Sequence, residues 1–248
     1  MRIIHPFQQV GKFFQDLFFP NTCCHCGKMI EQATPINPFC PHCLSFLTEV
    51  SAEDVKSNIL DRLQPNFIDH LWIAFQFNSV IREILHLIKY KKMPDLGCQV
   101  GGCIRQKFTN QISDLQNQPV LPIPLHPVRR KEREYNQSSQ IARGLFGDGS
   151  ETILEGMLIR KKYTSTQTKL TRKRRKINVK NAFKITNPQV IHGKTIVLVD
   201  DVITTGATMN ECAKLLKLHG ATRVLGVAIA VPLKEEWDWE NRMGEIAF

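Results

Sequence analysis

The order of apolar and polar positions along the chain predicts buried strands with helices between them. Short apolar runs, several of them rich in β-branched side chains, are typical of strands that are covered on both faces. Apolar residues spaced three and four positions apart predict amphipathic helices. The expected strands cover residues 69–77, 119–124, 194–199 and 223–231, and the expected helices cover residues 80–90, 137–146 and 208–219.

The last three of these elements follow one another as strand, helix and strand. The helix over residues 208–219 is closed by Gly220, a residue that favours helix C-termini, and the strand that follows ends at Pro232. Two strands joined in this way are expected to be parallel, with a right-handed crossover. We therefore expect an α/β fold, a parallel sheet flanked by helices.

The segments before the sheet are less regular. Residues 51–65 are polar and acidic and form a connector with some helical character. Near the N-terminus, an apolar stripe predicts a short helix docked on the rest of the protein, and a membrane-surface or partner-binding helix is the alternative. Polar residues interrupt this stretch, so we do not expect a signal peptide, and no apolar window is long enough for a transmembrane segment. The stripe consists of Phe7, Val10, Phe14, Leu17 and Phe18.

Composition changes this picture at one place. The chain has 248 residues, of which 42% are hydrophobic, as expected of a folded protein. Its net charge of +10 comes from the segment 160–184, which contains many lysines and arginines and no acid. Without this segment the chain is close to neutral, so the expected anionic partner is one that meets a single basic region.

Cysteine spacing predicts a metal site. With no export signal we expect the cytoplasm, where the eight cysteines indicate metal or catalysis before disulfides. Two C-x2-C pairs supply four thiolates for a tetrahedral Zn²⁺, with unpaired reduced cysteines as the alternative, and four protein ligands make such a site structural. The expected ligands are Cys23, Cys26, Cys40 and Cys43, with His25 and His42 as possible substitutes and Cys24 left over. The remaining thiols, Cys98, Cys103 and Cys212, are expected to be small buried apolar residues.

The most informative stretch follows the strand at residues 194–199. Asp200 and Asp201 come at the end of this buried strand, where open α/β sheets bind ligands. A turn of small residues around Gly206 then leads into a helix, whose N-terminus and backbone N–H groups favour an anion. One end of this site suits a phosphate and the other suits hydroxyl groups or Mg²⁺. A sugar phosphate meets both requirements.

These residues resemble a known motif. Leu198 to Thr208, LVDDVITTGAT, is similar to the phosphoribosyl pyrophosphate (PRPP) motif of type I phosphoribosyltransferases. The chain resembles most closely the ComF (ComFC) family of competence proteins, which joins a four-cysteine zinc ribbon to such a domain. Further matching residues are Leu87-Ile88-Lys89-Tyr90, Pro122-Ile123-Pro124-Leu125-His126-Pro127, Arg129, Arg130, Arg133, Tyr135-Asn136-Gln137, Thr164, Gln167, Arg172, Asn178-Val179 and Ala182-Phe183. The chain departs from the family at Lys92 and Glu134, where glycine is usual.

The resemblance implies a type I phosphoribosyltransferase-like domain over residues 51–248, after an N-terminal helix and zinc ribbon over residues 1–50. It implies that Asp200 and Asp201 bind the ribose hydroxyls of PRPP or its Mg²⁺. It further implies a 5′-phosphate site, pyrophosphate contacts and a flexible loop that closes over PRPP. These comprise Thr204, Thr205, Gly206 and Thr208 for the phosphate, Arg129 and Arg130 for the pyrophosphate, and Arg160, Lys161 and Gln167 in the loop.

The basic segment has three competing explanations. Its cations could neutralise pyrophosphate during phosphoribosyl transfer, bind single-stranded DNA through many phosphates, or form a solvated loop with no specific partner. The ComF resemblance favours DNA, because that family is associated with natural transformation on the cytoplasmic side of the inner membrane, and it implies DNA-translocation machinery as a partner. The expected DNA-binding residues are Arg172, Lys173, Arg174, Arg175, Lys176 and Lys180. No segment indicates an acceptor base, so an active transferase and a PRPP-responsive regulator both remain as alternatives.

Overall fold

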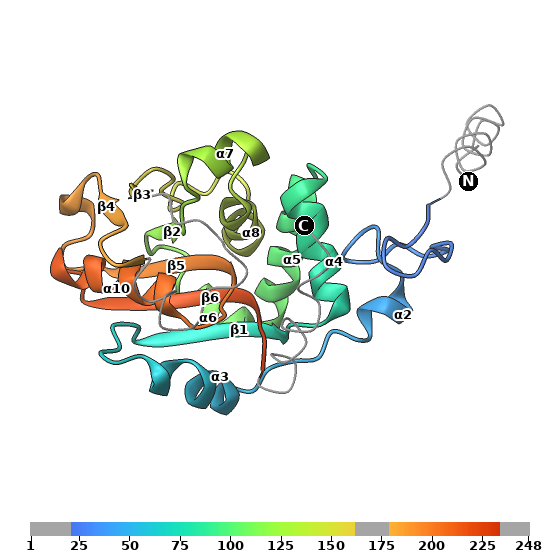
Figure 1. The fold of residues 1–248 in the computed structure, drawn as a ribbon, viewed down its shortest axis with the longest axis horizontal. Coiled ribbons are helices and arrows are strands. Elements are labelled where there is room, and N and C mark those ends of the chain that lie inside the picture. The colour runs from blue at the N-terminus through green and yellow to red at the C-terminus, as the bar shows by residue number, and fades with distance from the viewer. Residues whose placement is uncertain (1–20, 162–178, 234–248) are drawn as a thin grey trace, which may run out of the picture.

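A computed structural model of the chain describes residues 21–161 and 179–233. Its centre is a four-stranded parallel sheet in the order β1-β6-β5-β2 (Figure 1). The four strands that the sequence predicts are therefore confirmed, and so is their parallel arrangement. They are β1 (His70–Gln76), β2 (Val120–Pro122), β5 (Thr195–Val202) and β6 (Arg223–Val231).

Helices cover both faces of this sheet. In β5, Val197 and Val199 belong to the core that faces α4, α5 and α8, whereas Ile196 and Leu198 belong to the core that faces α3 and α10. Both sets are fully buried, because successive side chains of a strand point to opposite faces. The helices on the first face are α4 (Ser79–Tyr90), α5 (Pro94–Lys107) and α8 (Gln137–Phe146), and those on the second are α3 (Ala52–Asn58) and α10 (Ala207–Leu218).

Three helices confirm the predicted pattern, and four others within the described residues do not follow from it. The predictions over residues 80–90, 137–146 and 208–219 correspond to α4, α8 and α10. The sequence reasoning missed α2 (Pro41–Leu44), α5, α6 (Thr109–Ser113) and α7 (Pro127–Arg133). No helix within residues 21–161 and 179–233 is long and apolar enough to cross a bilayer. The predicted N-terminal helix lies outside the described residues.

Short elements complete the fold. The strands β3 (Leu158–Arg160) and β4 (Phe183–Ile185) pair antiparallel as a separate two-stranded sheet. The predicted connector contains α3 and then the 3-10 helix η1 (Leu60–Arg62), and a second 3-10 helix, η2 (Pro188–Val190), precedes β5. Because β3 and β4 pair, residues 160 and 183 lie opposite each other.

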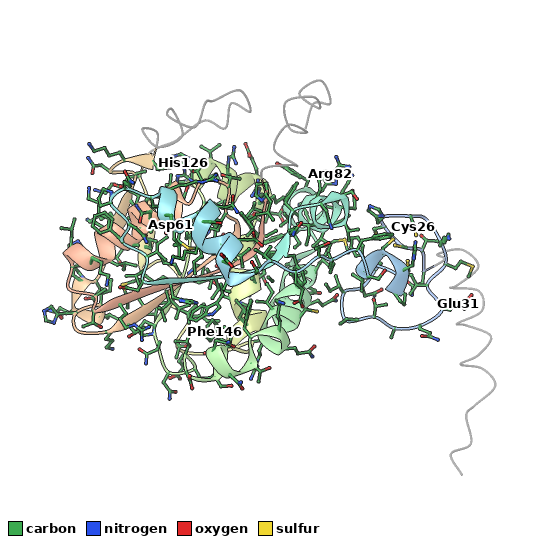
Figure 2. The ribbon with its side chains drawn as sticks, turned by 90° about the horizontal axis from the view of Figure 1, so that it is seen from below. Cys26, Glu31, Asp61, Arg82, His126 and Phe146 are labelled. Carbon is green, nitrogen blue, oxygen red and sulfur yellow. The ribbon has the colours of Figure 1, made fainter. Side chains whose placement is uncertain are left out.

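The N-terminal cysteine segment packs against α4 and α5. Its one short helix is α2 (Pro41–Leu44), at the blue end of the ribbon in Figure 1. Buried Ile36 and Phe39 belong to the same apolar core as α4 and α5. The Asn37 backbone N–H also donates to Gln99 Oε1 of α5 at 2.7 Å. Figure 2 shows Cys26 at one end of the long axis, while Phe146 lies on the body of the sheet.

Two glycines explain how α5 and α8 pack. A Cβ atom on Gly144 of α8 would lie 2.0 Å from the Cys98 carbonyl oxygen, and one on Gly101 of α5 would lie 2.3 Å from the Ile141 carbonyl oxygen. The helices therefore touch backbone to backbone, which glycine alone allows. Cys98 and Cys103 of α5 are partly exposed. Of the three remaining thiols, only Cys212 is therefore fully buried as expected.

Replacing Gly144 by Ala should destabilise the protein by about 1–3 kcal/mol, because the added methyl group forces the two helices apart. Urea unfolding of the purified chain measures this change. Gly102→Ala is the matched control, since nothing lies within 4 Å of its added Cβ atom. The control should stabilise the protein by about 0.5–1 kcal/mol through helix propensity. Equal effects of the two substitutions would contradict the close helix crossing.

Candidate functional site

The two predicted carboxylates lie at the carboxyl end of β5. Asp201 is buried, with 7% of its surface exposed, and its Oδ2 atom forms an ion pair with Lys89 Nζ of α4 at 2.5 Å. The other oxygen, Oδ1, accepts a hydrogen bond from the Val202 backbone N–H at 2.8 Å. Asp200 Oδ1 accepts from the Asp201 backbone N–H at 2.9 Å. Both carboxylates are therefore held by the strand itself, and one is also held by a lysine.

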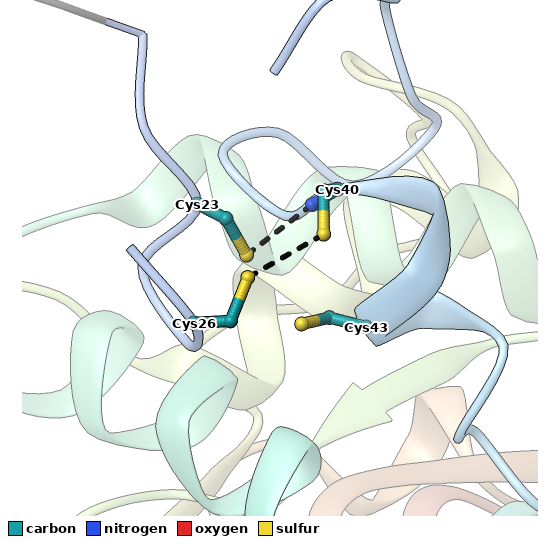
Figure 3. A group of neighbouring side chains, drawn as sticks. All are labelled: Cys23, Cys26, Cys40 and Cys43. Atoms are coloured by element: carbon teal, nitrogen blue, oxygen red, sulfur yellow. Dashed lines mark hydrogen bonds between the residues drawn. The ribbon is translucent and has the colours of Figure 1, made fainter. Parts of the chain in front are cut away.

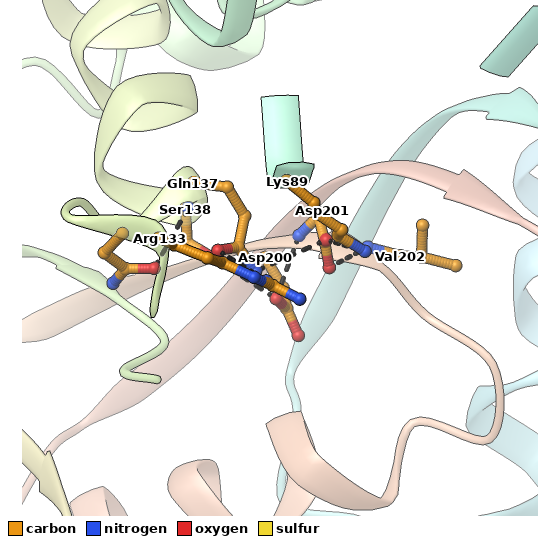
Figure 4. A network of polar contacts seen from close by, with 8 residues as sticks. Lys89, Arg133, Gln137, Ser138, Asp200, Asp201 and Val202 are labelled. Atoms are coloured by element: carbon orange, nitrogen blue, oxygen red, sulfur yellow. Dashed lines mark hydrogen bonds and ion pairs between the residues drawn. The ribbon is translucent and has the colours of Figure 1, made fainter. Parts of the chain in front are cut away.

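A polar network from α7 and α8 reaches the same carboxylates (Figure 4). Ser138 Oγ donates to Asp200 Oδ1 at 3.3 Å, and Gln137 Nε2 donates to Asp201 Oδ2 at 3.4 Å. Buried Arg133 donates from Nη1 to Gln137 Oε1 at 3.2 Å. The end of α7 and the start of α8 therefore set the orientation of the acid pair.

The two carboxylates have opposite proton affinities. Burial and the neighbouring charge of Asp201 raise the pKa of Asp200 to about 8. Burial also acts to raise the pKa of Asp201, but Lys89 and the Val202 N–H outweigh it and lower that pKa below its ordinary value. At neutral pH, Asp201 is therefore ionised and paired with Lys89, whereas Asp200 holds a proton. A cation or a hydroxyl donor that approaches Asp200 would favour release of this proton.

The predicted phosphate loop lies directly after the acid pair. Gly206 adopts a left-handed conformation, with φ of 71°, and forms the N-cap of α10. Buried Thr205 accepts from the Ala207 backbone N–H at 3.4 Å through its hydroxyl oxygen. A Cβ atom on Gly206 would lie 2.9 Å from Ile59, so the chain between α3 and η1 packs closely over this turn. The turn and the start of α10 form a suitable place for an anion.

Basic side chains approach from the side of β2. Burial lowers the pKa of Arg160, at the end of β3. The charge of Arg129 also lowers this pKa, whereas the charge of Asp200 raises it. A cavity of about 460 Å³ lies between the loop after β2, α7 and β3. Arg130, Lys131 and Arg160 line it together with several proline and aliphatic side chains. Its volume lies within the range of about 300–1,000 Å³ that is typical of small-molecule sites.

The structure therefore places many of the predicted site residues near one another. From the carboxyl end of β5, an inner strand, the chain runs through the acid pair and the loop into the first turn of α10. The loop contains Thr204, Thr205 and Gly206, and the helix begins with Ala207 and Thr208. Arg129 and Arg130 lie on α7, and Lys161 and Lys180 are exposed at the two ends of the basic segment. Gln167, Arg172, Lys173, Arg174, Arg175 and Lys176 lie outside the described residues.

Sequence reasoning gave no role to four residues of the network. The residues that match the family include Lys89, Arg133 and Gln137, but nothing in their spacing connected them with the acid pair. Ser138 stood out in no motif. The one available sign of the ion pair was a lysine in the last turn of an amphipathic helix. A lysine at such a position is more often solvated than paired, so it did not stand out.

The two departures from the family pattern meet in space. Lys92 and Glu134 both have left-handed backbone, with φ of 54° and 68°, which explains why glycine suits these positions. Their side chains form an ion pair, Lys92 Nζ to Glu134 Oε1. The pair joins the chain after α4 to the end of α7. Both charged residues are largely exposed, so its contribution to stability is small.

The four predicted cysteine ligands form one cluster (Figure 3). Their sulfur atoms all lie within 4.8 Å of one another. Cys23 Sγ accepts from the Cys40 backbone N–H at 3.3 Å, and Gly27, with φ of 73°, follows the first pair of cysteines. Although burial opposes it, hydrogen bonding from backbone N–H groups lowers the pKa of Cys23 to about 6. Burial and the neighbouring thiols raise the pKa of Cys43 instead, so the four thiols share their protons unequally. Four sulfur atoms gathered in one place are the ligand set of structural Zn²⁺ sites.

The remaining residues of the knuckles lie around this cluster. His25 Nδ1 is 3.5 Å from Cys43 Sγ, and its Nε2 is 3.1 Å from Ser79 Oγ at the start of α4. His25 therefore connects the cluster with the main domain instead of completing the set of four sulfurs. Cys24 is exposed and lies outside the cluster.

Comparisons with known proteins agree with these features. Residues 136–242 match the phosphoribosyl transferase domain family. Competence protein F of Haemophilus influenzae is 29% identical over 203 residues, which cover 82% of this chain and 81% of that protein. DNA utilization protein YhgH of Salmonella typhimurium is 31% identical over 149 residues, 57% of this chain and 63% of its own length. YhgH of Escherichia coli K12 is 36% identical over 105 residues, 42% of this chain and 45% of that protein.

The chain fits a ComF-type protein. It combines a phosphoribosyltransferase domain on a mostly parallel sheet with a four-cysteine cluster near the N-terminus. The region that matches the domain family begins at Asn136, so it contains α8, β5 and α10. The match therefore includes both the acid pair and the phosphate loop.

Metal removal from this chain should lower its stability, because the cysteine segment shares its apolar core with α4 and α5. We expect one zinc per chain by elemental analysis. Cys43→Ser should lose that zinc and lower the melting temperature by at least about 5 °C, since each kcal/mol corresponds to about 2–4 °C in a domain of this size. Cys24→Ser is the matched control and should retain the metal. A zinc-free parent protein with an unchanged melting temperature would contradict this site.

Asp200→Asn should stabilise the magnesium-free protein by an amount that grows from pH 5 to pH 8. Unfolded Asp200 loses its proton near 3.8, whereas the folded residue keeps it up to about 8. Stability therefore falls as the pH rises through this window, and the neutral Asn side chain removes the loss. Thermal unfolding at both pH values measures the difference.

Asp201→Asn serves as the contrast, because it removes the partner of Lys89 and should destabilise the protein at both pH values. A shift caused by Asp200→Asn that is the same at pH 5 and pH 8 would show that Asp200 is ionised throughout this range.

Proposed function

We propose that this chain binds PRPP with Mg²⁺ at the carboxyl end of β5 and handles incoming single-stranded DNA in the cytoplasm during natural transformation. The observation that carries the proposal is the acid pair followed by a phosphate loop, within the region that matches the phosphoribosyl transferase domain family. The names of the relatives, Competence protein F and DNA utilization protein YhgH, support the second half of the proposal.

In this proposal each end of PRPP meets a different part of the site. The turn at Thr204–Gly206 and the start of α10, with Thr208, hold the 5′-phosphate through backbone N–H groups and hydroxyls. Asp200 gives up its proton to accept a ribose hydroxyl or to face Mg²⁺, while Lys89 keeps Asp201 oriented. Mg²⁺ supplies charge neutralisation at the pyrophosphate. Arg129, Arg130 and Arg160 add cations on the β2 side.

The DNA part of the proposal rests on the position of the basic segment. The pairing of β3 with β4 brings Arg160 opposite Phe183, and the Lys161 backbone N–H donates to the Ala182 carbonyl at 2.7 Å. The segment between them therefore begins and ends beside the PRPP site. Its cations, Arg172 to Lys176 together with Lys180, bind DNA phosphates, and DNA-translocation machinery at the inner membrane is the proposed source of the strand.

A second candidate function is phosphoribosyl transfer to a nitrogenous acceptor. The cavity that Arg130 and Arg160 line favours it, because these two cations would stabilise the charge on departing pyrophosphate. Binding of PRPP without turnover would instead make the chain a PRPP-responsive regulator. Pyrophosphate release from PRPP, measured with a panel of bases and with single-stranded DNA, separates the transferase from the regulator.

One experiment tests both halves of the main proposal. Magnesium and PRPP together should raise the melting temperature of the parent protein, and Asp200→Asn/Asp201→Asn should abolish this rise. Fluorescence anisotropy with a labelled oligonucleotide should show binding whose log K falls with log salt at a slope of about −3.5, if about five phosphates are contacted.

Charge reversal over residues 172–176 is the variant for the DNA half, and it should remove most of the slope while the PRPP shift remains. A parent protein with no shift would overturn the PRPP assignment. A salt slope near zero would overturn the DNA assignment.

A further inference from the structure

Tyr90, the last residue of α4, exposes 55% of its surface to solvent. Its ring is nevertheless held by two neighbours. The His86 ring, one turn earlier, lies with its centroid 5.5 Å away and its plane inclined by 40°. The guanidinium carbon of Arg133 lies 5.3 Å from the Tyr90 ring centroid. An aromatic ring is therefore presented to solvent in a fixed place.

Arg133 ties this ring to the carboxylate network. The arginine has only 7% of its surface exposed, and its Nη1 donates to Gln137, which in turn donates to Asp201. A buried guanidinium with a hydrogen-bonded orientation has little freedom, so the ring that it supports is preorganised as well. The ring and the acid pair are in this way parts of one connected structure.

The surroundings of the ring are basic. Lys89 is committed to Asp201 and Lys92 to Glu134, but Lys91 lies between them and is exposed. Arg133, which contacts the ring, belongs to α7, and exposed Arg130 and Lys131 come in the turn before it. Glu132 is the one acidic residue within α7, and it is exposed. Glu134, which follows α7, pairs with Lys92.

A fixed aromatic face among cations is the arrangement that binds single-stranded nucleic acid, because bases stack on the ring and phosphates meet the cations. We propose that Tyr90 is a stacking platform for one base of single-stranded DNA, with Lys91 and Lys131 of α7 on the neighbouring phosphates. This inference rests on the proposed function and adds a DNA contact outside the basic segment. It places a DNA strand at a ring that Arg133 and Gln137 connect to the carboxylates we assign to PRPP.

The test is binding of labelled oligothymidylate to the intact, zinc-loaded protein, measured by fluorescence anisotropy. Tyr90→Ala should weaken binding about tenfold, since loss of one stacked base has an effect of this order. Tyr90→Phe should retain the parent affinity, because the ring is kept. Phe46→Ala is the matched control, an exposed aromatic residue that packs against His42 of the cysteine segment, and it should change nothing.

Salt dependence separates stacking from charge. Tyr90→Ala should leave the slope of log K against log salt unchanged, whereas Lys91→Ala should make it less steep by about 0.7, the loss of one phosphate contact. An oligonucleotide of the same length with abasic sites should bind parent and Tyr90→Ala equally. A flattened slope for Tyr90→Ala would show an electrostatic disturbance and overturn the platform.

Photocrosslinking gives a readout that a merely structural role of the tyrosine does not move. DNA with 5-iododeoxyuridine should crosslink to the peptide that contains Tyr90 in the parent protein, and this product should be absent with Tyr90→Ala. Unchanged affinity of Tyr90→Ala, in a parent that binds DNA, would overturn the platform and leave the proposed function standing. A parent that binds no single-stranded DNA would overturn the DNA half of the proposed function itself.

Discussion

Two adjacent carboxylates at the end of one buried strand are the constraint on which the rest of the site depends. Both cannot be ionised there without a partner, because burial and mutual repulsion raise the free energy of the doubly charged state. In this fold a lysine pairs with Asp201, and Asp200 keeps its proton because its pKa is raised. The lysine arrives from α4 and the supporting amide from α8, so the ends of these helices must meet β5 at one place.

The difference between local patterns and long-range contacts explains how much of the fold and of the site the sequence could predict. The strands and helices with strong periodicity, including β5, α4 and α10, follow from local patterns alone. The helix α5 does not, because Gly97, Gly101 and Gly102 lower its propensity, and what stabilises it is its contact with α8. Likewise, the acid pair and the phosphate loop lie in one short motif and could be predicted. The ion pair of Asp201 with Lys89 joins residues far apart in the sequence, and only the fold brings them together.

The helix α4 joins the two parts of the molecule. At its first turn, Ser79 contacts His25 beside the cysteine cluster. In its last turn, Lys89 pairs with Asp201, and the Tyr90 ring contacts Arg133 of the polar network. The apolar face of the same helix is buried between them, with Ile81, Ile84 and Ile88 almost wholly inaccessible. A single rigid element therefore spans from the proposed zinc site to the proposed PRPP site.

The strand order carries a consequence for synthesis of the chain. Within the described residues, β1 finds its parallel partner in β6, and His70 lies opposite Leu225, about 150 residues later. At a translation rate of about 5–20 residues per second, β1 waits on the order of ten seconds or more for this partner. During that time the cysteine segment can already fold around its metal, whereas β1 still has an open edge. Until β6 has been made, β1 lacks the strand that covers this edge in the folded sheet, and an uncovered strand edge can pair with other chains.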